Sequence, residues 1–301
     1  MKISKFAVLA VVGMAAPAFA ATFPEVEGND TKATANVVGL TADGDTITGA
    51  HTASAQLDYF RVRTPAATRA IYRHRLGLNN VTNLVGDIRG LNQAGTAEAS
   101  VQASSSITNP PRFVQWYGFG KQEEIFYRTT GAITSYTATY SSQVIIPTDR
   151  GSYLPGSFTL STQGQTTTDT ELFLYDSDFN IVAINDDLQA SPLVTQSAIT
   201  AALAPGRYYL AVSTFNTANN LANPAPDSAF GSRMDFANSL VRNSTSSAFV
   251  DLDFTINGTA FTNSVAGAFD ISWNTFEVIP TPGVVSLAGL VGLASLRRRR
   301  A

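Results

Sequence analysis

Residues 250–258 read VDLDFTING, with apolar and polar side chains alternating up to the Asn-Gly pair. Successive side chains of a β-strand point to opposite faces, so this alternation predicts a strand with one buried and one exposed face. Asn-Gly is a strong signal for a two-residue hairpin, and residues 259–261 supply the returning strand. The stretch therefore predicts antiparallel β-structure.

The residues that follow continue this pattern with one interruption. Phe269, Ile271 and Trp273 alternate with polar residues, and the apolar phase then shifts to Phe276 and Val278. Such a shift predicts a β-bulge or a bend in the strand.

Several earlier segments also read as strands. Residues 171–175 and 181–185 are short apolar runs around a polar connection, which predicts a hairpin. A turn at residues 204–206 leads into the aromatic and β-branched run 207–213, which predicts another strand. Residues 197–203 fit either helix or strand. The whole pattern predicts an all-β fold of one or two β-sandwich (jelly-roll-like) domains.

The body of the chain divides near residues 148–155. This predicts an N-terminal β-domain over residues 21–148 and a second β-sandwich domain over residues 149–278, with a single sandwich carrying a large insertion as the alternative. Residues 214–247 are rich in Asn, Ala, Ser and Pro, and we expect a long surface excursion there.

The first 20 residues have the three parts of a secretory signal peptide. Two lysines precede the apolar run 6–15, and Ala18-Phe19-Ala20 is a small-x-small cleavage site. We expect cleavage between Ala20 and Ala21 by signal peptidase, and therefore export of the protein.

The last residues, 279–301, also combine three parts. A Pro280-Thr281-Pro282-Gly283 break precedes an apolar run that ends at Leu296, and four arginines follow it. That run is shorter than the roughly 20 residues of a conventional membrane-spanning helix. The arginines would stay cytoplasmic by the positive-inside rule, which leaves the body of the chain outside. The tail therefore predicts a marginal transmembrane helix, suited to temporary anchoring.

Together with the signal peptide, this tail resembles the PEP-CTERM sorting signal, also labelled an ice-binding-protein C-terminal domain. Thr281 stands where that signal usually has glutamate. The resemblance implies that a membrane-embedded exosortase recognises the tail, cuts near the Pro-x-Pro motif and leaves the protein in the cell envelope or extracellular matrix. A plain tail anchor is the alternative. The sorting residues that the resemblance marks are Pro280, Thr281, Pro282, Gly283, Arg297, Arg298, Arg299 and Arg300.

Composition limits the partners and the chemistry. The chain has a net charge of −3, and both terminal signals carry bases without acids, so the mature body is more acidic still. This argues against nucleic acid as a partner. The chain has no cysteine, so disulfides cannot stabilise it outside the cell.

Short segments of the body resemble the bacterial pre-peptidase C-terminal (PPC) β-sandwich module. The matching segments are EVEGNDTKA at 25–33, GDTITG at 44–49, LDYFRV at 57–62, DTELFLYD at 169–176, NDD at 185–187 and PGRYY at 205–209. The resemblance implies an accessory, non-catalytic module. It also implies a calcium site formed by Glu25, Glu27, Asn29, Asp30 and Asp58, although Gln56 stands where a further Asp is common. The alternative is that these acids cap turns.

Two further motifs have competing interpretations. Asp176-Ser177-Asp178-Phe179-Asn180 begins like a calcium loop, but Ile181 replaces the required glycine, so we expect a plain turn. Trp116 and Tyr117 lie among glycines and can form either a ligand surface or part of the core; we favour the core.

No motif for catalysis accompanies these features. The two histidines, His51 and His74, have no zinc-type partner at useful spacing, and the nucleophile-elbow and P-loop patterns are missing from the sequence. We therefore expect a non-catalytic exported surface or matrix protein, with signal peptidase and an exosortase-type enzyme as partners. The leading alternative is a module that binds polysaccharide or a surface partner with the help of Ca²⁺; a secreted hydrolase is a third.

Overall fold

The computed structural model describes residues 20–79, 83–92, 94–104, 112–190, 193–221 and 234–281. These residues form β-strands and one short 3-10 helix, η1 (Lys32–Thr34), so the all-β prediction is confirmed. Within this part of the chain, no helix is both long and apolar enough to cross a bilayer. The predicted signal peptide up to residue 19 and the tail from Pro282 onward lie outside the described residues.

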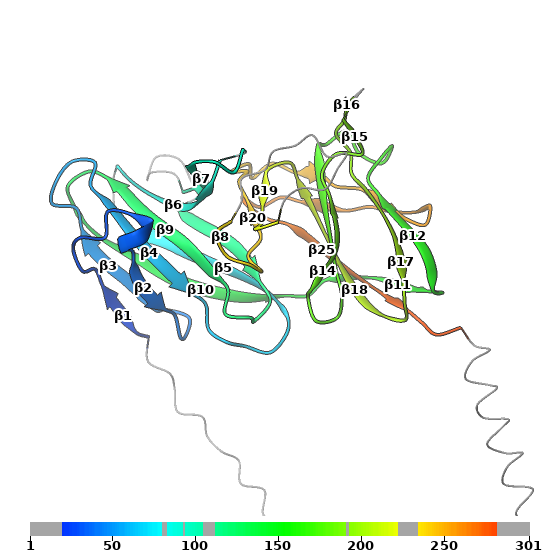
Figure 1. Cartoon of the computed structure of the whole chain (residues 1–301), viewed down its shortest axis with the longest axis horizontal. Helices are drawn as coiled ribbons and strands as arrows, with labels where there is room; N and C mark the ends of the chain where they lie inside the picture. Colours follow the sequence, from blue (N-terminus) through cyan, green and yellow to red (C-terminus); the bar gives the residue numbers. More distant parts are fainter. Residues whose placement is uncertain are drawn as a thin grey trace, which may run out of the picture.

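The strands form two halves that lie side by side along the long axis of the molecule (Figure 1). We call residues 20–145 the N-terminal half and residues 148–281 the C-terminal half. Each half contains two main sheets, and the chain passes from one half to the other between β10 (Ser135–Ile145) and β11 (Thr148–Tyr153).

The N-terminal half has two five-stranded sheets around one apolar cluster. The first sheet has the order β1 (Thr22–Pro24), β3 (Thr46–Ala50), β10, β5 (Ile71–Asn79), β8 (Phe113–Gly118). The second has the order β2 (Asn36–Gly39), β4 (Leu57–Arg63), β9 (Glu124–Gly131), β6 (Leu84–Leu91), β7 (Glu98–Ala103). Strands β1 and β2 pair in parallel with β3 and β4, and the remaining pairs are antiparallel. Both sheets supply the core, which includes Ile47 and Trp116 from one and Phe60 and Tyr127 from the other.

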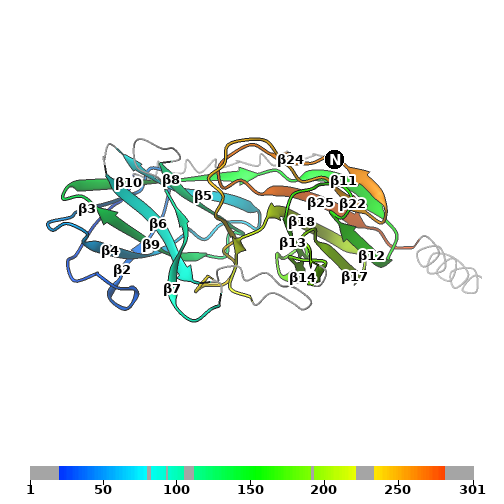
Figure 2. The same ribbon diagram turned by 90° about the horizontal axis from the view of Figure 1, so that it is seen from above.

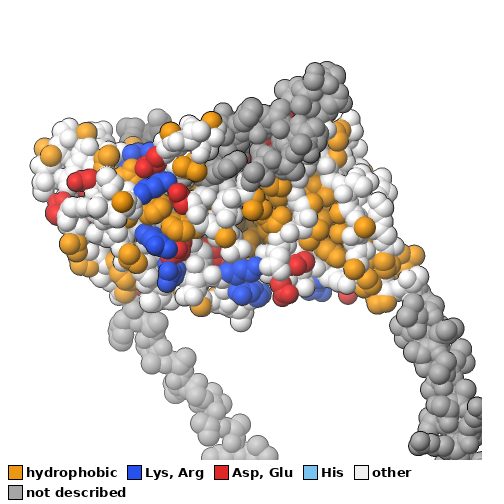
Figure 3. Space-filling view, viewed as in Figure 1, with side chains coloured by type: hydrophobic (Ala, Val, Ile, Leu, Met, Phe, Trp, Pro, Cys, Tyr) orange, Lys and Arg blue, Asp and Glu red, His pale blue; other side chains and the backbone are white. Residues whose placement is uncertain are grey.

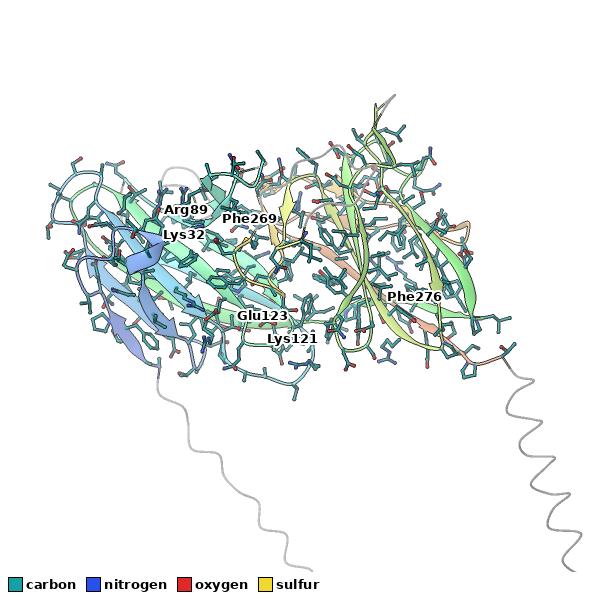
Figure 4. All side chains as sticks on the ribbon, in the orientation of Figure 1. Lys32, Arg89, Lys121, Glu123, Phe269 and Phe276 are labelled. Atoms are coloured by element: carbon teal, nitrogen blue, oxygen red, sulfur yellow. The ribbon has the colours of Figure 1, made fainter. Side chains whose placement is uncertain are left out.

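The C-terminal half has a five-stranded and a four-stranded sheet around a second cluster. The five-stranded sheet has the order β11, β25 (Ser272–Val278), β18 (Gly206–Thr214), β13 (Thr170–Tyr175), β14 (Ile181–Asn185). The other has the order β17 (Ala198–Leu203), β12 (Gly156–Ser161), β22 (Phe254–Ile256), β23 (Thr259–Phe261). Three two-stranded pairs complete the fold: β15 (Gln189–Ala190) with β16 (Leu193–Val194), β19 (Thr217–Ala218) with β20 (Val241–Arg242), and β21 (Val250–Asp251) with β24 (Ser264–Val265). Strand β17 resolves the ambiguous stretch 197–203 as a strand, and Phe276 lies inside this half (Figure 4).

The alternating stretch 250–256 buries its apolar face as predicted. Leu252, Phe254 and Ile256 are fully buried, while the residues between them are partly exposed. Ile256 pairs with Thr259 across Asn257 and Gly258, whose φ angles are 50° and 80°. Positive φ at both central residues is what a tight hairpin of the right twist requires, and Asn-Gly supplies it at little cost.

The predicted bulge in the last strand is wrong in its position. Strand β25 pairs with β18 without a break from Ser272 to Val278, and the extra residue lies in its other neighbour, β11, between Asp149 and Ser152. The apolar phase shifts because β25 is buried on both faces. Trp273 packs into the cluster between the halves, whereas Phe276 packs into the C-terminal core.

The expectation of a surface excursion over residues 214–247 is wrong for part of the described stretch, while other residues of the stretch are exposed. Ala218, Met234 and Val241 are buried in the core of the N-terminal half, and Leu240 bridges to Tyr117 of β8. Figure 2 shows this yellow segment between the two halves. The segment is polar overall and weakly periodic, so its sequence does not indicate that a few apolar residues anchor it in the core.

An aromatic cluster joins the halves. It contains Tyr117 and Phe119 from the N-terminal half with Tyr175, Phe179 and Trp273 from the C-terminal half. Lys121 and Glu123 lie at this junction (Figure 4), and the Lys121 ammonium donates to the carbonyl of Phe179 at 2.9 Å. In the view of Figure 3, charged side chains gather over the N-terminal half and the junction, and apolar side chains over the C-terminal half.

Candidate metal centre

Two of the residues that the PPC resemblance marks lie together between the sheets of the N-terminal half. Glu25 directly follows β1, and its backbone N–H donates to the carbonyl of Thr48 in β3 at 2.7 Å. Asp58 is the second residue of β4, and the register of that strand places it opposite Thr129 of β9. Sheet pairing thus brings two acids that are far apart in sequence to one place.

Asp58 is fully buried and hydrogen-bonded on one side. Its Oδ2 accepts the hydroxyl of Tyr136 at 2.7 Å and lies 3.0 Å from Nε2 of His51. Burial raises the pKa of Asp58 because the charged carboxylate loses its hydration. His51 is also buried, and burial lowers its pKa, so the imidazole is held in its neutral form.

Glu25 lies next to this pair. Its Oε2 accepts the backbone N–H of Ala50 at 3.0 Å, and burial together with the nearby Asp58 raises its pKa to about 7. Gly49 makes this approach possible, since a Cβ there would collide with the Glu25 carboxylate and the Tyr136 hydroxyl. Two neighbouring acids that resist ionisation are electrostatically suited to a cation.

Three buried oxygens at this location have no N–H or hydroxyl donor among the described residues: Oε1 of Glu25, Oδ1 of Asn29 and Oδ1 of Asp58. The Glu25 carboxyl can donate to Asp58, but only while Glu25 is protonated. The amide of Asn29 donates to the carbonyl of Tyr59 at 3.3 Å, which anchors Asn29 beside Asp58. Carboxylate and amide oxygens are the ligands that Ca²⁺ prefers. A bound cation would give these oxygens a partner when both carboxyl groups are ionised.

The other two predicted ligands lie at the surface. Glu27 is exposed and its Oε2 accepts the side-chain amide of Gln56 at 3.0 Å, although its charge still raises the pKa of Glu25 and Asp58. Asp30 is exposed. The arrangement therefore brings together Glu25, Asn29 and Asp58, with Glu27 at the rim.

A second acidic group lies in the C-terminal half. Asp169, Asp186 and Asp187 have carboxylate oxygens within 4.8 Å of one another, and no other trio of acids or histidines among the described residues meets this condition. The sequence placed Asp169 just before one strand of the predicted hairpin and the Asp pair just after the other. Pairing of β13 with β14 explains their proximity. The positions of these acids at the two ends of a predicted hairpin already indicate that they lie close together.

The Asp176 motif is a plain turn, as expected. Oδ1 of Asp176 accepts the backbone N–H groups of Asp178 and Asn180, both at 2.9 Å. These bonds close the connection between β13 and β14.

The proposed ligand surface at Trp116 and Tyr117 is not present as a surface. Their side chains are 0% and 2% exposed, and each ring packs against other aromatic rings. His74, also buried, stacks on Trp116 and bonds to the hydroxyl of Tyr140 at 2.8 Å. These residues belong to the core, because consecutive positions of β8 face two different clusters.

The predicted processing sites are described only in part. The backbone N–H of Ala21 donates to Oδ1 of the buried Asp45 at 2.7 Å, and Ala20 is exposed. Pro280 and Thr281 are exposed just beyond the end of β25. Pro282, Gly283 and the four arginines lie outside the described residues.

No protein-family model matches the chain, and no curated protein matches it. The PEP-CTERM and PPC resemblances therefore stay predictions, and the function has to be argued from the geometry.

Proposed function

We propose that this chain is a non-catalytic, exported bacterial protein of the cell surface or extracellular matrix, with jelly-roll-like sandwich halves and a Ca²⁺ ion bound in the first. The observation that carries the calcium proposal is the set of buried oxygens on Glu25, Asn29 and Asp58 that have no N–H or hydroxyl donor among the described residues, two of them on carboxyl groups that share a hydrogen bond only while Glu25 is protonated. Buried polar atoms without a partner are costly, and a divalent cation would remove that cost when both acids are ionised.

The surrounding charges favour the same ion. Glu25 and Asp58 repel each other when both are ionised, and Glu27 adds a third negative charge at the rim. Ca²⁺ takes six to eight oxygen ligands in flexible geometry, so Glu25, Asn29 and Asp58 would hold it with water or Glu27 completing the shell. Mg²⁺ keeps its own waters more strongly and fits such a site less well.

Calcium titration of the purified protein, followed by thermal unfolding, tests this site. At 100 times the Kd, a ligand bound only by the folded state adds about 2.7 kcal/mol to stability. We expect Glu25→Gln to abolish the calcium-induced rise in the unfolding temperature. Asp186→Asn, which alters the other acidic trio, is the matched control and should keep the rise. Loss of the rise in Asp186→Asn alone would assign the ion to the C-terminal half.

Two contacts support processing at both ends. Cleavage after Ala20 would turn the N–H of Ala21 into an α-ammonium next to the buried carboxylate of Asp45. The Pro280-Thr281 segment is exposed beyond the last strand, where a sorting enzyme has access to it. Exosortase sorting rests on the tail sequence and remains part of the proposal.

Intact mass spectrometry of the protein from its native cells tests the processing. We expect a species that begins at Ala21 and ends near Pro282, recovered outside the cytoplasmic membrane. A membrane species that keeps Arg297 to Arg300 would make the tail a simple anchor and would exclude exosortase cleavage.

Polysaccharide binding is the second candidate function. A polar groove in the C-terminal half, lined by Arg150, Phe249 and two acids, favours it.

A further inference from the structure

The groove lies beside β11 and the β21–β24 pair. It has a volume of about 670 Å³, within the roughly 300–1,000 Å³ range of small-molecule clefts. One wall is the polar face of the stretch 250–253, whose apolar face packs into the core. The alternation of this stretch therefore also places the carboxylates of Asp251 and Asp253 at the groove.

Arg150 is held rigidly at this groove. Its Nε donates to the side-chain oxygen of Asn274 at 2.8 Å and one Nη donates to the carbonyl of Thr262 at 3.3 Å. The guanidinium also lies over the rings of Phe254 and Phe261, at 5.4 and 5.1 Å from their centroids. Arginine has five N–H donors. The Arg150 donors that do not bond to Asn274 or Thr262 have no acceptor among the described residues. An arginine fixed in this way is ready to donate to a ligand.

Two carboxylates provide acceptors. Asp251 uses Oδ1 for the N–H of Asp253 at 3.0 Å, and Asp253 uses Oδ1 for the N–H of Asn263 at 2.6 Å. These bonds fix both side chains, and Oδ2 of each takes no hydrogen bond from the described residues. Neither acid forms an ion pair with Arg150 within 4.0 Å in the described part of the chain, so all three groups keep capacity for a ligand.

Phe249 provides an apolar face at the rim. Its side chain is 70% exposed, which is unusual for an aromatic residue in a protein that buries most of its others. A single exposed apolar residue is common, but this ring lines the same groove as Arg150 and two carboxylates, and ligand clefts combine apolar side chains with a few convergent polar groups.

We propose that this groove binds a short segment of a neutral polysaccharide. Phe249 would cover the apolar face of one sugar ring, while Arg150 donates to its hydroxyl oxygens and Asp251 and Asp253 accept from its hydroxyl protons. The two carboxylates outnumber the single guanidinium, so the groove disfavours uronate or sulfated chains. This inference deepens the second candidate function and rests on it.

Titration calorimetry on the purified protein tests the groove. The probes are linear hexasaccharides of β-1,4-glucose, β-1,3-glucose and β-1,4-mannose, with a hexagalacturonate as the charged comparison. We expect saturable binding of at least one neutral probe and a loss of about tenfold or more in affinity for Phe249→Ala. Val37→Ala removes an equally exposed apolar side chain from the N-terminal half and should leave the affinity unchanged.

Arg150→Lys provides a second variant. It keeps the charge but loses the planar set of donors, so we expect weaker binding with intact folding. Neutral probes that bind Phe249→Ala and the unmodified protein equally would overturn the groove while leaving polysaccharide binding in place. Binding of hexagalacturonate alone would overturn the neutral-chain proposal while leaving polysaccharide binding in place, and binding of none of the probes would overturn both. Neither result bears on export, which mass spectrometry tests separately.

Discussion

The two halves of the molecule are stabilised in different ways. Every ion pair formed by the described residues takes its cation from the N-terminal half, and three of the carboxylates buried there are Asp45, Asp58 and Asp87. In the C-terminal half, Tyr153, Phe158, Tyr208 and Phe276 pack as a group with ring centroids 5.7–5.8 Å apart.

This difference has physical consequences. Aromatic packing depends on buried area and shape, so it changes little with pH or ions. Buried carboxylates depend on protonation and on any cation that compensates them. The aromatic group around Phe276 should therefore respond to loss of volume. The buried or half-buried acids, which are Glu25 and Asp58 in the N-terminal half and the Asp169 trio in the C-terminal half, should respond to the composition of the medium.

Phe276→Ala should have the largest effect. The ring is 1% exposed and contacts three other rings, so its removal leaves a cavity worth about 3–5 kcal/mol of unfolding free energy. Urea unfolding measures the loss, which should be the same at pH 5 and pH 7. Ile146→Ala, at an 83% exposed position, is the control and should change stability by less than about 0.5 kcal/mol.

The pH dependence of the calcium-free protein should come next. The pKa of Glu25 rises from 4.5 to about 7 on folding, so the folded state binds more protons than the unfolded state between these values. The contribution of Glu25 to stability should therefore fall as pH rises from about 4.5 to 7, by about 1–2 kcal/mol after allowance for its partial exposure. The buried His51 and His74 act in the opposite sense, because burial lowers their pKa values and the unfolded state then binds more protons below about pH 6.5. Asp58, whose pKa is also raised by burial, acts in the same sense as Glu25.

Unfolding midpoints at several pH values, with and without calcium, measure this effect. Glu25→Gln removes the Glu25 contribution, so the stability of the variant relative to the unmodified protein should increase as pH rises through this window. Calcium should reduce that difference in slope because it compensates the ionised acids. Parallel profiles for the variant and the unmodified protein would contradict the electrostatic picture of the site.

Arg63→Ala should have the smallest effect. Its guanidinium lies 2.7 Å from the Glu124 carboxylate, but the arginine side chain is 47% exposed. Exposed ion pairs contribute about 0.2–1 kcal/mol, and salt screens them. The difference from the unmodified protein should disappear in 1 M salt; a loss of several kcal/mol there would show a packing role instead.

The sequence predicted local structure better than it predicted contacts between distant segments. Alternation and Asn-Gly placed the hairpin of β22 and β23 over residues 254–261 because both signals act over neighbouring residues, although residues 250–251 form a separate strand that pairs with β24. The same logic failed for Trp273 and Phe276, which face different cores, since periodicity assumes a single buried face. It also missed Met234 and Leu240, whose burial depends on a neighbouring half that no local pattern encodes.

The candidate site shows the same limit. Acid-rich segments predicted Glu25, Asn29 and Asp58, but nothing local indicated that His51, Thr129 and Tyr136 would surround Asp58. The Asp169 trio was visible as residues flanking a predicted hairpin, and its convergence followed only from the register of β13 and β14. The sequence around Trp116 and Tyr117 did not distinguish a core from a ligand surface, because an aromatic pair beside glycines occurs in both.

The hydrogen bond between Ala21 and Asp45 would make the stability of the fold depend on cleavage after Ala20. Asp45 is buried, and although burial raises its pKa, hydrogen bonds from Thr41, Ala21 and Ala42 lower it overall, so the carboxylate is charged at neutral pH. In the precursor Ala21 offers a neutral amide to it; after cleavage it would offer an α-ammonium, whose ordinary pKa is about 7.7–8.0. Both hydrogen bonds are charge-assisted, and the ammonium adds a direct Coulombic attraction to the carboxylate.

If the proposed cleavage after Ala20 takes place, the precursor should be the less stable form. Unfolding of a protein that starts at Ala21, compared with one that keeps residues before it, measures the gain, and Asp45→Asn should erase the difference. Under the proposed export, removal of the signal peptide would then add a final increment of stability, so the folded protein would be most stable only after cleavage.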